Sequence, residues 1–364
     1  MRFPFGKKPA PEPRTPPERV LLGHVIAPSG KLVLLDFGCL NLWSHRASPL
    51  LSEGIFSPEI TDLANRARDL RIEGPDAREA GRLLDRGWHP LYVYDVGPNF
   101  LDSVDETFRQ SIGEEGLDAS LTVLPERISH RDRIDLALEE GRNAGEITFH
   151  GMHATVLGDL PRDRELAVYG EPMAEEEWSD RWRWVTLEVR PESEIATSRP
   201  VGHIAVDYAR IMLADADALG SWVHEDTLDG QADFVFWGKD AESVARKFKA
   251  DSLGEGTYGW GDVPIDRAVE LGAQVEDLIA DSPALKLKTD FRPHSHHYLV
   301  MRQVRATSTG TGTLQLGEAV LCGFMTSWGD GIFDVIGEFD RNDELVRVRI
   351  DLGNPEMVAL VASL

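Results

Sequence analysis

The fold is decided near the C-terminus, by the stretch Cys322-Gly323-Phe324-Met325-Thr326-Ser327-Trp328-Gly329-Asp330-Gly331-Ile332-Phe333-Asp334-Val335. Two apolar runs flank a Trp-Gly-Asp-Gly sequence, and a third run of alternating hydrophobicity follows at 345–352. Glycine readily adopts positive φ angles and aspartate tolerates them, so Gly329-Asp330-Gly331 predicts a sharp turn between two strands. This turn would present a single carboxylate, that of Asp330.

The sequence around this stretch predicts a unit of the α+β class. Helices are expected at 240–248 and 264–279, and a strand at 232–237. Short polar turns favour an antiparallel meander near the C-terminus. After residue 282 only strands are expected, at 285–289, 296–306, 313–316, 319–325, 332–339 and 345–352.

The first half of the chain has a different pattern. Ser57-Pro58-Glu59 predicts a helix start, with serine as N-cap and proline at the first helical position, and Ser129 with Asp132 predicts another. Between 91 and 149, strand patterns alternate with helical patterns, which indicates an α/β arrangement that is at least partly parallel. The apolar runs at 20–26 and 31–37 predict a hairpin.

Length favours more than one unit, because 364 residues exceed the roughly 250–300 residues that one hydrophobic core usually supports. We therefore predict an α/β N-terminal unit followed by an α+β unit with a mainly antiparallel sheet. The predicted divisions are a disordered, basic, Pro-rich tail at 1–19, the α/β unit at 20–150, a charged connection with an edge strand at 151–200, and the α+β unit at 201–364.

Composition narrows the function classes. A net charge of -24 argues against nucleic acid or an anionic membrane as a partner, because phosphate groups are neutralised by Lys and Arg. No run approaches the roughly 18 apolar residues of a membrane span, and Cys39 and Cys322 provide no disulfide framework, so a cytoplasmic protein is expected. The chain also has no Gly-rich phosphate loop and no Gly-x-Ser-x-Gly nucleophile motif.

The C-terminal stretch resembles a bacterial protein family of unknown function. The matching positions are Ser327, Gly329, Asp330, Gly331, Phe333 and Val335. Further matches are 205–215, 229–234, and Ser29-Gly30-Lys31 followed by Asp36, which resembles the opening hairpin of that family. The resemblance implies a fold and no activity. Proteins of this kind are similar in style to immunity and accessory proteins of bacterial conflict systems, which implies a binding role.

The densest group of chemically versatile residues is Arg292-Pro293-His294-Ser295-His296-His297. On an extended strand, His294 and His296 would project from one face and could bind a divalent transition metal such as zinc. Asp330, Asp207 or Asp290 could complete the site, and His203 could be a third imidazole. Asp330 could also act as a general base. The alternatives are a strand entrance with hydrogen-bonded histidines and a turn closed by the Asp330 carboxylate.

Arg210 lies in an apolar run, 201–213, that also holds Asp207. Arginine binds planar carboxylates with two parallel hydrogen bonds, so Arg210 could anchor an anionic substrate. An ion pair with a nearby aspartate is the alternative. In a metal-dependent hydrolase with His294 and His296 as ligands, Asp330 would be a ligand or the base. Arg210 would hold the anionic substrate.

Aromatic residues gather in an acidic segment, at Trp178, Trp182 and Trp184. Tryptophan is enriched at protein interfaces, so this strand face could bind a basic protein, steered by the net negative charge. The alternative is that the face packs on the core. We expect a cytosolic, acidic binding protein of the immunity or accessory type, with the metal-dependent hydrolase as the alternative.

Overall fold

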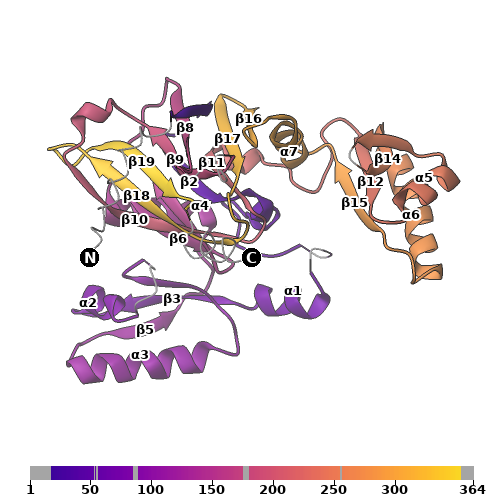
Figure 1. The fold of residues 1–364 in the computed structure, drawn as a ribbon. Coiled ribbons are helices and arrows are strands. Elements are labelled where there is room, and N and C mark those ends of the chain that lie inside the picture. The colour runs from indigo at the N-terminus through magenta and orange to yellow at the C-terminus, as the bar shows by residue number, and fades with distance from the viewer. Residues whose placement is uncertain are drawn as a thin grey trace, which may run out of the picture.

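The computed structural model describes residues 18–52, 54, 56–84, 89–174, 180–254 and 256–353. Within these ranges the chain is a mixed α/β protein, and the strand pairs are antiparallel. Figure 1 shows three parts: a large body of two stacked sheets, a small layer of strands and helices beside it, and a lobe at the other end. Trp178 lies outside the described residues.

The body contains two six-stranded sheets. One has the order β1-β8-β9-β19-β18-β10, with bounds Val20–Val25, Leu166–Pro172, Trp182–Glu188, Leu345–Asp351, Gly331–Phe339 and Thr197–Val206. The other has the order β16-β17-β11-β2-β7-β6, with bounds Thr311–Leu316, Ala319–Met325, Arg210–Asp215, Leu32–Asp36, Met152–Leu157 and Ala144–Phe149. Both sheets contribute to one apolar core, which includes Leu34, Phe324 and Val335.

Helices cover the other face of the second sheet. Strand β2 shows why, since Leu32 and Leu34 face the core between the sheets whereas Val33 and Leu35 face a second core. That second core is closed by α4 (His130–Gly141) and α7 (His296–Ala306), with a 3-10 turn at Phe37–Leu42. The central strand β2 is therefore buried on both faces.

The small layer is formed by the sheet β4-β3-β5, with bounds Tyr92–Val96, Arg68–Glu73 and Ser120–Val123, and by three helices. These are α1 (Pro58–Asn65), α2 (Ala77–Arg82) and α3 (Leu101–Glu115). Its own core includes Ile72, Ala80 and Phe108. Buried Arg133 of α4 forms ion pairs with Asp69 and Asp95, which joins this layer to the body.

The lobe consists of the sheet β13-β14-β12-β15 and two helices. Its strands are Asp251–Gly254, Thr257–Pro264, Gln231–Trp237 and Lys288–Pro293, and its helices are α5 (Ala241–Phe248) and α6 (Ile265–Asp281). Phe234, Phe236 and Val275 are among the residues of its separate core. Since β15 is followed directly by α7, the lobe joins the body through that helix (Figure 1). None of the helices in the described ranges combines the length and apolar character needed to cross a membrane.

Three expectations from the sequence were wrong. Segment 296–306 is the helix α7 and not a strand, because Ser295 caps it and its apolar residues fall on one helical face. Strands β1 and β2 do not form a hairpin, because β1 pairs with β8 and β2 pairs with β7 and β11. The pairing of β3 with β4 and β5 is antiparallel, not parallel.

The predicted division at residues 150–200 does not follow the sheets. Strand β2, from the first predicted unit, pairs with β11 from the last, and β9, from the predicted connection, pairs with β19. The two large sheets thus combine strands from the beginning, middle and end of the chain. Long-range pairing of this kind leaves no local sequence pattern.

Candidate anion-binding site

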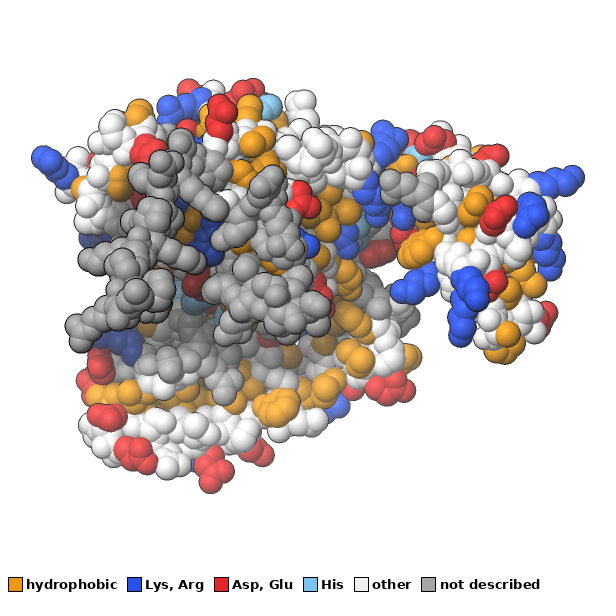
Figure 2. Space-filling view, viewed as in Figure 1, with side chains coloured by type: hydrophobic (Ala, Val, Ile, Leu, Met, Phe, Trp, Pro, Cys, Tyr) orange, Lys and Arg blue, Asp and Glu red, His pale blue; other side chains and the backbone are white. Residues whose placement is uncertain are grey.

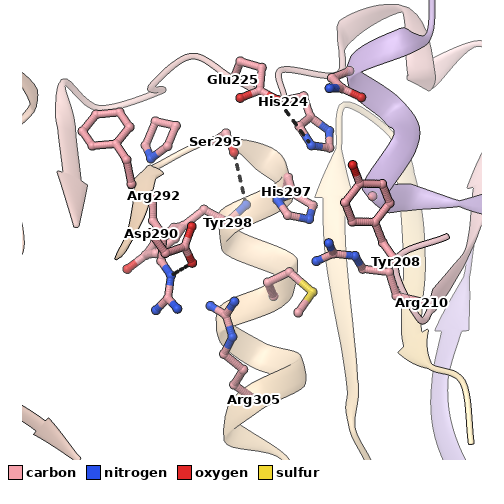
Figure 3. Close-up of a pocket in the computed structure, with 15 residues that line it drawn as sticks. Tyr208, Arg210, His224, Glu225, Asp290, Arg292, Ser295, His297, Tyr298 and Arg305 are labelled. Atoms are coloured by element: carbon pink, nitrogen blue, oxygen red, sulfur yellow. Dashed lines mark hydrogen bonds and ion pairs between the residues drawn. The ribbon is translucent and has the colours of Figure 1, made fainter. Parts of the chain in front are cut away.

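A cavity of about 260 Å³ lies where the lobe meets the body. It is lined by Tyr208 and Arg210 at the start of β11, Asp290 and Arg292 of β15, and residues of α7 that include His297 and Arg305. Figure 3 shows these side chains around the exposed side of α7. In Figure 2, Lys and Arg side chains gather at the same junction between the body and the lobe.

Three guanidinium groups line the cavity. Arg292 is paired, since its Nε donates to Oδ2 of Asp290 at 2.6 Å. Within the described part of the chain, the guanidinium groups of Arg210 and Arg305 form neither an ion pair nor a hydrogen bond, and Nε of Arg210 is buried. The Arg210 guanidinium carbon lies 5.6 Å from the centroid of the Phe37 ring and 5.3 Å from that of Tyr208. Partial burial lowers the pKa of both arginines, and the positive charges of Arg292 and Arg210 lower that of Arg305 further, whereas Asp290 opposes the shift at both and Asp36 opposes it at Arg210. The positive charges of Arg210, Arg292 and Arg305 therefore all face the same cavity.

The turn before Arg210 is held by two carboxylates. Buried Asp36 accepts hydrogen bonds through Oδ2 from the backbone N–H groups of Asp207 and Tyr208, at 2.7 and 2.8 Å. Oδ1 of Asp330 accepts one from the N–H of Ala209 at 2.9 Å. Ala209 has a φ of 55°, a strained angle for alanine that these contacts stabilise. Asp330 thus positions the residue preceding Arg210 and does not line the cavity.

Two uncharged imidazoles form another wall of the cavity. The rings of His224 and His297 are stacked, with centroids 4.4 Å apart and an interplanar angle of 16°. Burial, together with the positive charge of Arg210, lowers the pKa of His224 to about 4. Burial and the charges of His224, Arg210 and Arg305 lower the pKa of His297 to about 2. Near neutral pH the pair is therefore uncharged and adds hydrogen-bonding groups without adding charge.

Helix α7 carries several of these groups, and its start is fixed by Ser295. The serine hydroxyl accepts a hydrogen bond from the N–H of Tyr298 at 3.1 Å, as an N-cap does. Tyr298 in turn donates its hydroxyl to Oδ2 of Asp233 at 2.8 Å. This contact ties the helix to strand β12 of the lobe.

His294 has a structural environment of its own. Its Nδ1 lies 3.0 Å from Asp229 and its Nε2 lies 3.1 Å from Asp233. Burial opposes the charged form, but hydrogen bonds to these two carboxylates raise the pKa of His294 above its usual value. With both ring nitrogens facing acids, the ring is best suited to the doubly protonated form, which has no lone pair for a metal ion.

The predicted metal ligands are not assembled. In the described ranges, the group of ionisable side chains close enough to hold a metal is Asp233, Asp262 and His294. Nδ1 of His296 instead accepts a hydrogen bond from the N–H of Val223 at 2.9 Å. Asp207 is exposed and does not line the cavity. The structure does bring Asp207, Arg210 and Asp330 together, around the turn that precedes β11.

The aromatic strand face is only half-exposed. Trp182 packs against the core between the two large sheets, and its Nε1 donates to the Thr309 carbonyl at 3.3 Å. The Trp184 ring is covered by Arg349, whose guanidinium carbon lies 4.4 Å from the ring centroid. This arrangement matches the alternative in which the face packs on the protein.

Sequence reasoning identified Arg210 and missed Arg305, His224 and Tyr208. Arg305 could have been found from the helical spacing of Met301 and Val304, which places it on the last turn of α7. His224 is isolated in the sequence and carries no signal of its own. It meets His297 only because the chain returns to α7 after the whole lobe.

The charges of the lining residues favour a small oxyanion over a cation. Arg210, Arg292 and Arg305 provide three positive charges, and Glu225 and Asp290 provide two negative charges, which leaves one positive charge in excess. Such an excess stands out in a chain with a net charge of -24. Guanidinium groups bind carboxylates and phosphates through charge-assisted hydrogen bonds.

No family model, curated protein or solved structure matches this chain.

Proposed function

We propose that this protein binds a small oxyanion, a carboxylate or a phosphate, in the cavity between β11, β15 and α7. The observation that carries the proposal is that Arg210 and Arg305 line one cavity without an ion pair among the described residues. Placing cations close together with no carboxylate within ion-pair distance costs free energy, which an anionic ligand would recover. The neutral histidines and the Tyr208 hydroxyl supply further hydrogen-bonding groups.

The proposed role is binding, without a reaction. The buried Asp36 carboxylate is occupied by three backbone N–H groups, and Cys39 and Cys322 are buried, with the pKa of each thiol raised to about 12, chiefly by burial. These groups are thus poorly suited to act as base or nucleophile. The wider hypothesis of a basic protein partner rests on the net charge and stays a prediction.

The test is calorimetric titration of the purified protein with inorganic phosphate, acetate and a panel of phosphate monoesters and dicarboxylates. We expect at least one class to bind, and Arg305→Gln to weaken that binding by about tenfold or more, as loss of a charge-assisted hydrogen bond does. Arg305 is exposed, so the substitution should leave folding unchanged.

Arg341→Gln is the matched control. Arg341 is exposed, does not line the cavity, and its loss changes the net charge by the same amount. Equal weakening by both variants would show that the net charge, and not the cavity, governs binding. Failure of every anion in the panel to bind would refute the proposal.

A further inference from the structure

A groove adjoins the anion cavity. It has a volume of about 730 Å³, within the roughly 300–1,000 Å³ of small-molecule sites. The two hollows share Asn41, His224 and Glu225 in their linings, so they lie side by side. Trp43 and Trp222 line the groove but not the cavity.

Both tryptophans are fixed by neighbouring groups. Nε1 of Trp222 donates to Nδ1 of His224 at 3.2 Å, and the Trp222 ring lies 5.6 Å from the ring of His296. The Trp43 ring contacts the rings of His130 and Phe149, at 5.1 and 5.7 Å. Both indoles are half-buried, so each also has an exposed part. Indoles held in this way provide a preorganised surface for a flat aromatic group.

His224 links the aromatic groove to the cationic cavity. Nδ1 of its ring accepts from Trp222 in the groove, and its face stacks on His297 in the cavity. Glu225, at the same boundary, is exposed and can accept a hydrogen bond from a hydroxyl or amine of a ligand. A groove that holds two tryptophans, together with the polar residues Ser52, Glu225 and Asp226, therefore adjoins a cavity with excess positive charge.

We infer that the ligand is an aromatic oxyanion, with its phosphate or carboxylate head at Arg210 and Arg305 and its planar ring in the groove between Trp43 and Trp222. This inference rests on the proposed function and specifies the class of ligand. Charge complementarity places the head, and the adjacency of the two hollows, with the tryptophans lining only the groove, places the ring. A simple inorganic anion would fill only the cavity and leave the groove to water.

The experiment compares matched pairs of probes by calorimetry on the full chain: inorganic phosphate with phenyl phosphate, and acetate with indole-3-acetate. In one of the two pairs we expect the aromatic probe to bind about tenfold more tightly, or better, than the probe without a ring. Stacking of a ring on an aromatic side chain contributes a free energy of this size. The pair that shows the gain identifies the head as phosphate or carboxylate. Equal affinities within both pairs would overturn the inference and leave the proposed function standing.

Variants separate the two compartments. Trp222→Leu should abolish the tighter binding of the aromatic probe and leave the affinity for the probe without a ring unchanged. Arg305→Gln should weaken the binding of both probes. Trp184→Leu, on strand β9, is the matched control and should change neither. Because Trp222 also contacts the core, Ser52→Leu provides a second variant, in which an exposed residue is enlarged to fill the groove. Retention of the full gain in both groove variants would overturn the inference, and absence of binding by all four probes would overturn the proposed function itself.

Discussion

At the scale of single residues, Arg133 offers the sharpest test of what holds the body to the small layer. It is fully buried and donates to Asp69 and Asp95, with N–O distances of 2.8–3.3 Å. Burial would raise the pKa of Asp95, but Arg133 and Arg127 hold it well below its usual value. We expect Arg133→Met to lower the free energy of unfolding by about 3–5 kcal/mol, because it leaves the buried Asp69 carboxylate without its cation, while Asp95 keeps Arg127.

Urea denaturation measures this loss, and Arg82→Met is its control. Arg82 forms an exposed pair with Glu79 on α2, at 2.8 Å, and such surface pairs contribute about 1 kcal/mol or less. The two substitutions are chemically identical and differ in burial. Similar losses for both would contradict the assigned role of Arg133.

At the scale of elements, helix α7 determines the geometry of the cavity because it carries His297, Tyr298 and Arg305. Removing its N-cap through Ser295→Ala should lower the free energy of unfolding by about 1 kcal/mol. It should also weaken anion binding, because the first turn of the helix would be less well ordered. Ser129→Ala removes the equivalent cap of α4, where Ser129 accepts from the N–H of Asp132 at 3.1 Å, and α4 provides no residue to the cavity. For Ser129→Ala we expect a similar loss of stability in urea denaturation and unchanged anion binding in calorimetry. Equal effects of the two substitutions on anion binding would contradict the prediction.

The same elements show how much could be predicted from the sequence. The helix starts at Ser57 and Ser129 were predicted and are confirmed, because capping depends on residues three apart or fewer. Helix α7 was mistaken for a strand because its β-branched and aromatic residues favour strands, and its cap stands among histidines. Arg210 was predicted as an anion anchor from its apolar surroundings. Arg305, which lines the same cavity, could not be predicted once α7 was read as a strand. The pairing of β2 with β11 could not be predicted either, because it joins residues about 180 positions apart in the chain.

At the scale of the whole molecule, histidines of lowered pKa make stability depend on pH. Burial lowers the pKa of His130 well below 6.5, and burial lowers that of His150 and of His224 to about 4 and that of His297 to about 2. Below pH 6.5 the unfolded chain binds protons at these positions and the folded chain does not. The free energy of unfolding should therefore fall as the pH decreases from 6.5 to 5.5.

Groups with a raised pKa act in the opposite direction on acidification. His294, whose pKa is raised, contributes stability that is fully present below pH 6.5 and is lost as the pH rises through its folded pKa. Asp36 and Asp69, whose pKa values are raised mainly by burial, favour the folded state as the pH falls toward their unfolded value of 3.8. A loss of stability on acidification from pH 6.5 to 5.5 is therefore assigned to the histidines of lowered pKa, since the groups with a raised pKa act with the opposite sign.

A single substitution isolates one of these histidines. His150 has a φ of 47°, which asparagine tolerates, so His150→Asn removes the titrating ring with little backbone strain. Urea denaturation at pH 6.5 and 5.5 should show a smaller loss of stability in this variant than in the wild type, by up to about 1.4 kcal/mol per pH unit, the most that one proton can contribute. His24→Gln, at a half-exposed position on β1, is the control for the loss of an imidazole elsewhere in the fold. If His150→Asn retains the full loss on acidification, the imidazole of His150 takes up its proton in the folded protein as readily as in the unfolded chain, and the buried environment assigned to that ring is incorrect.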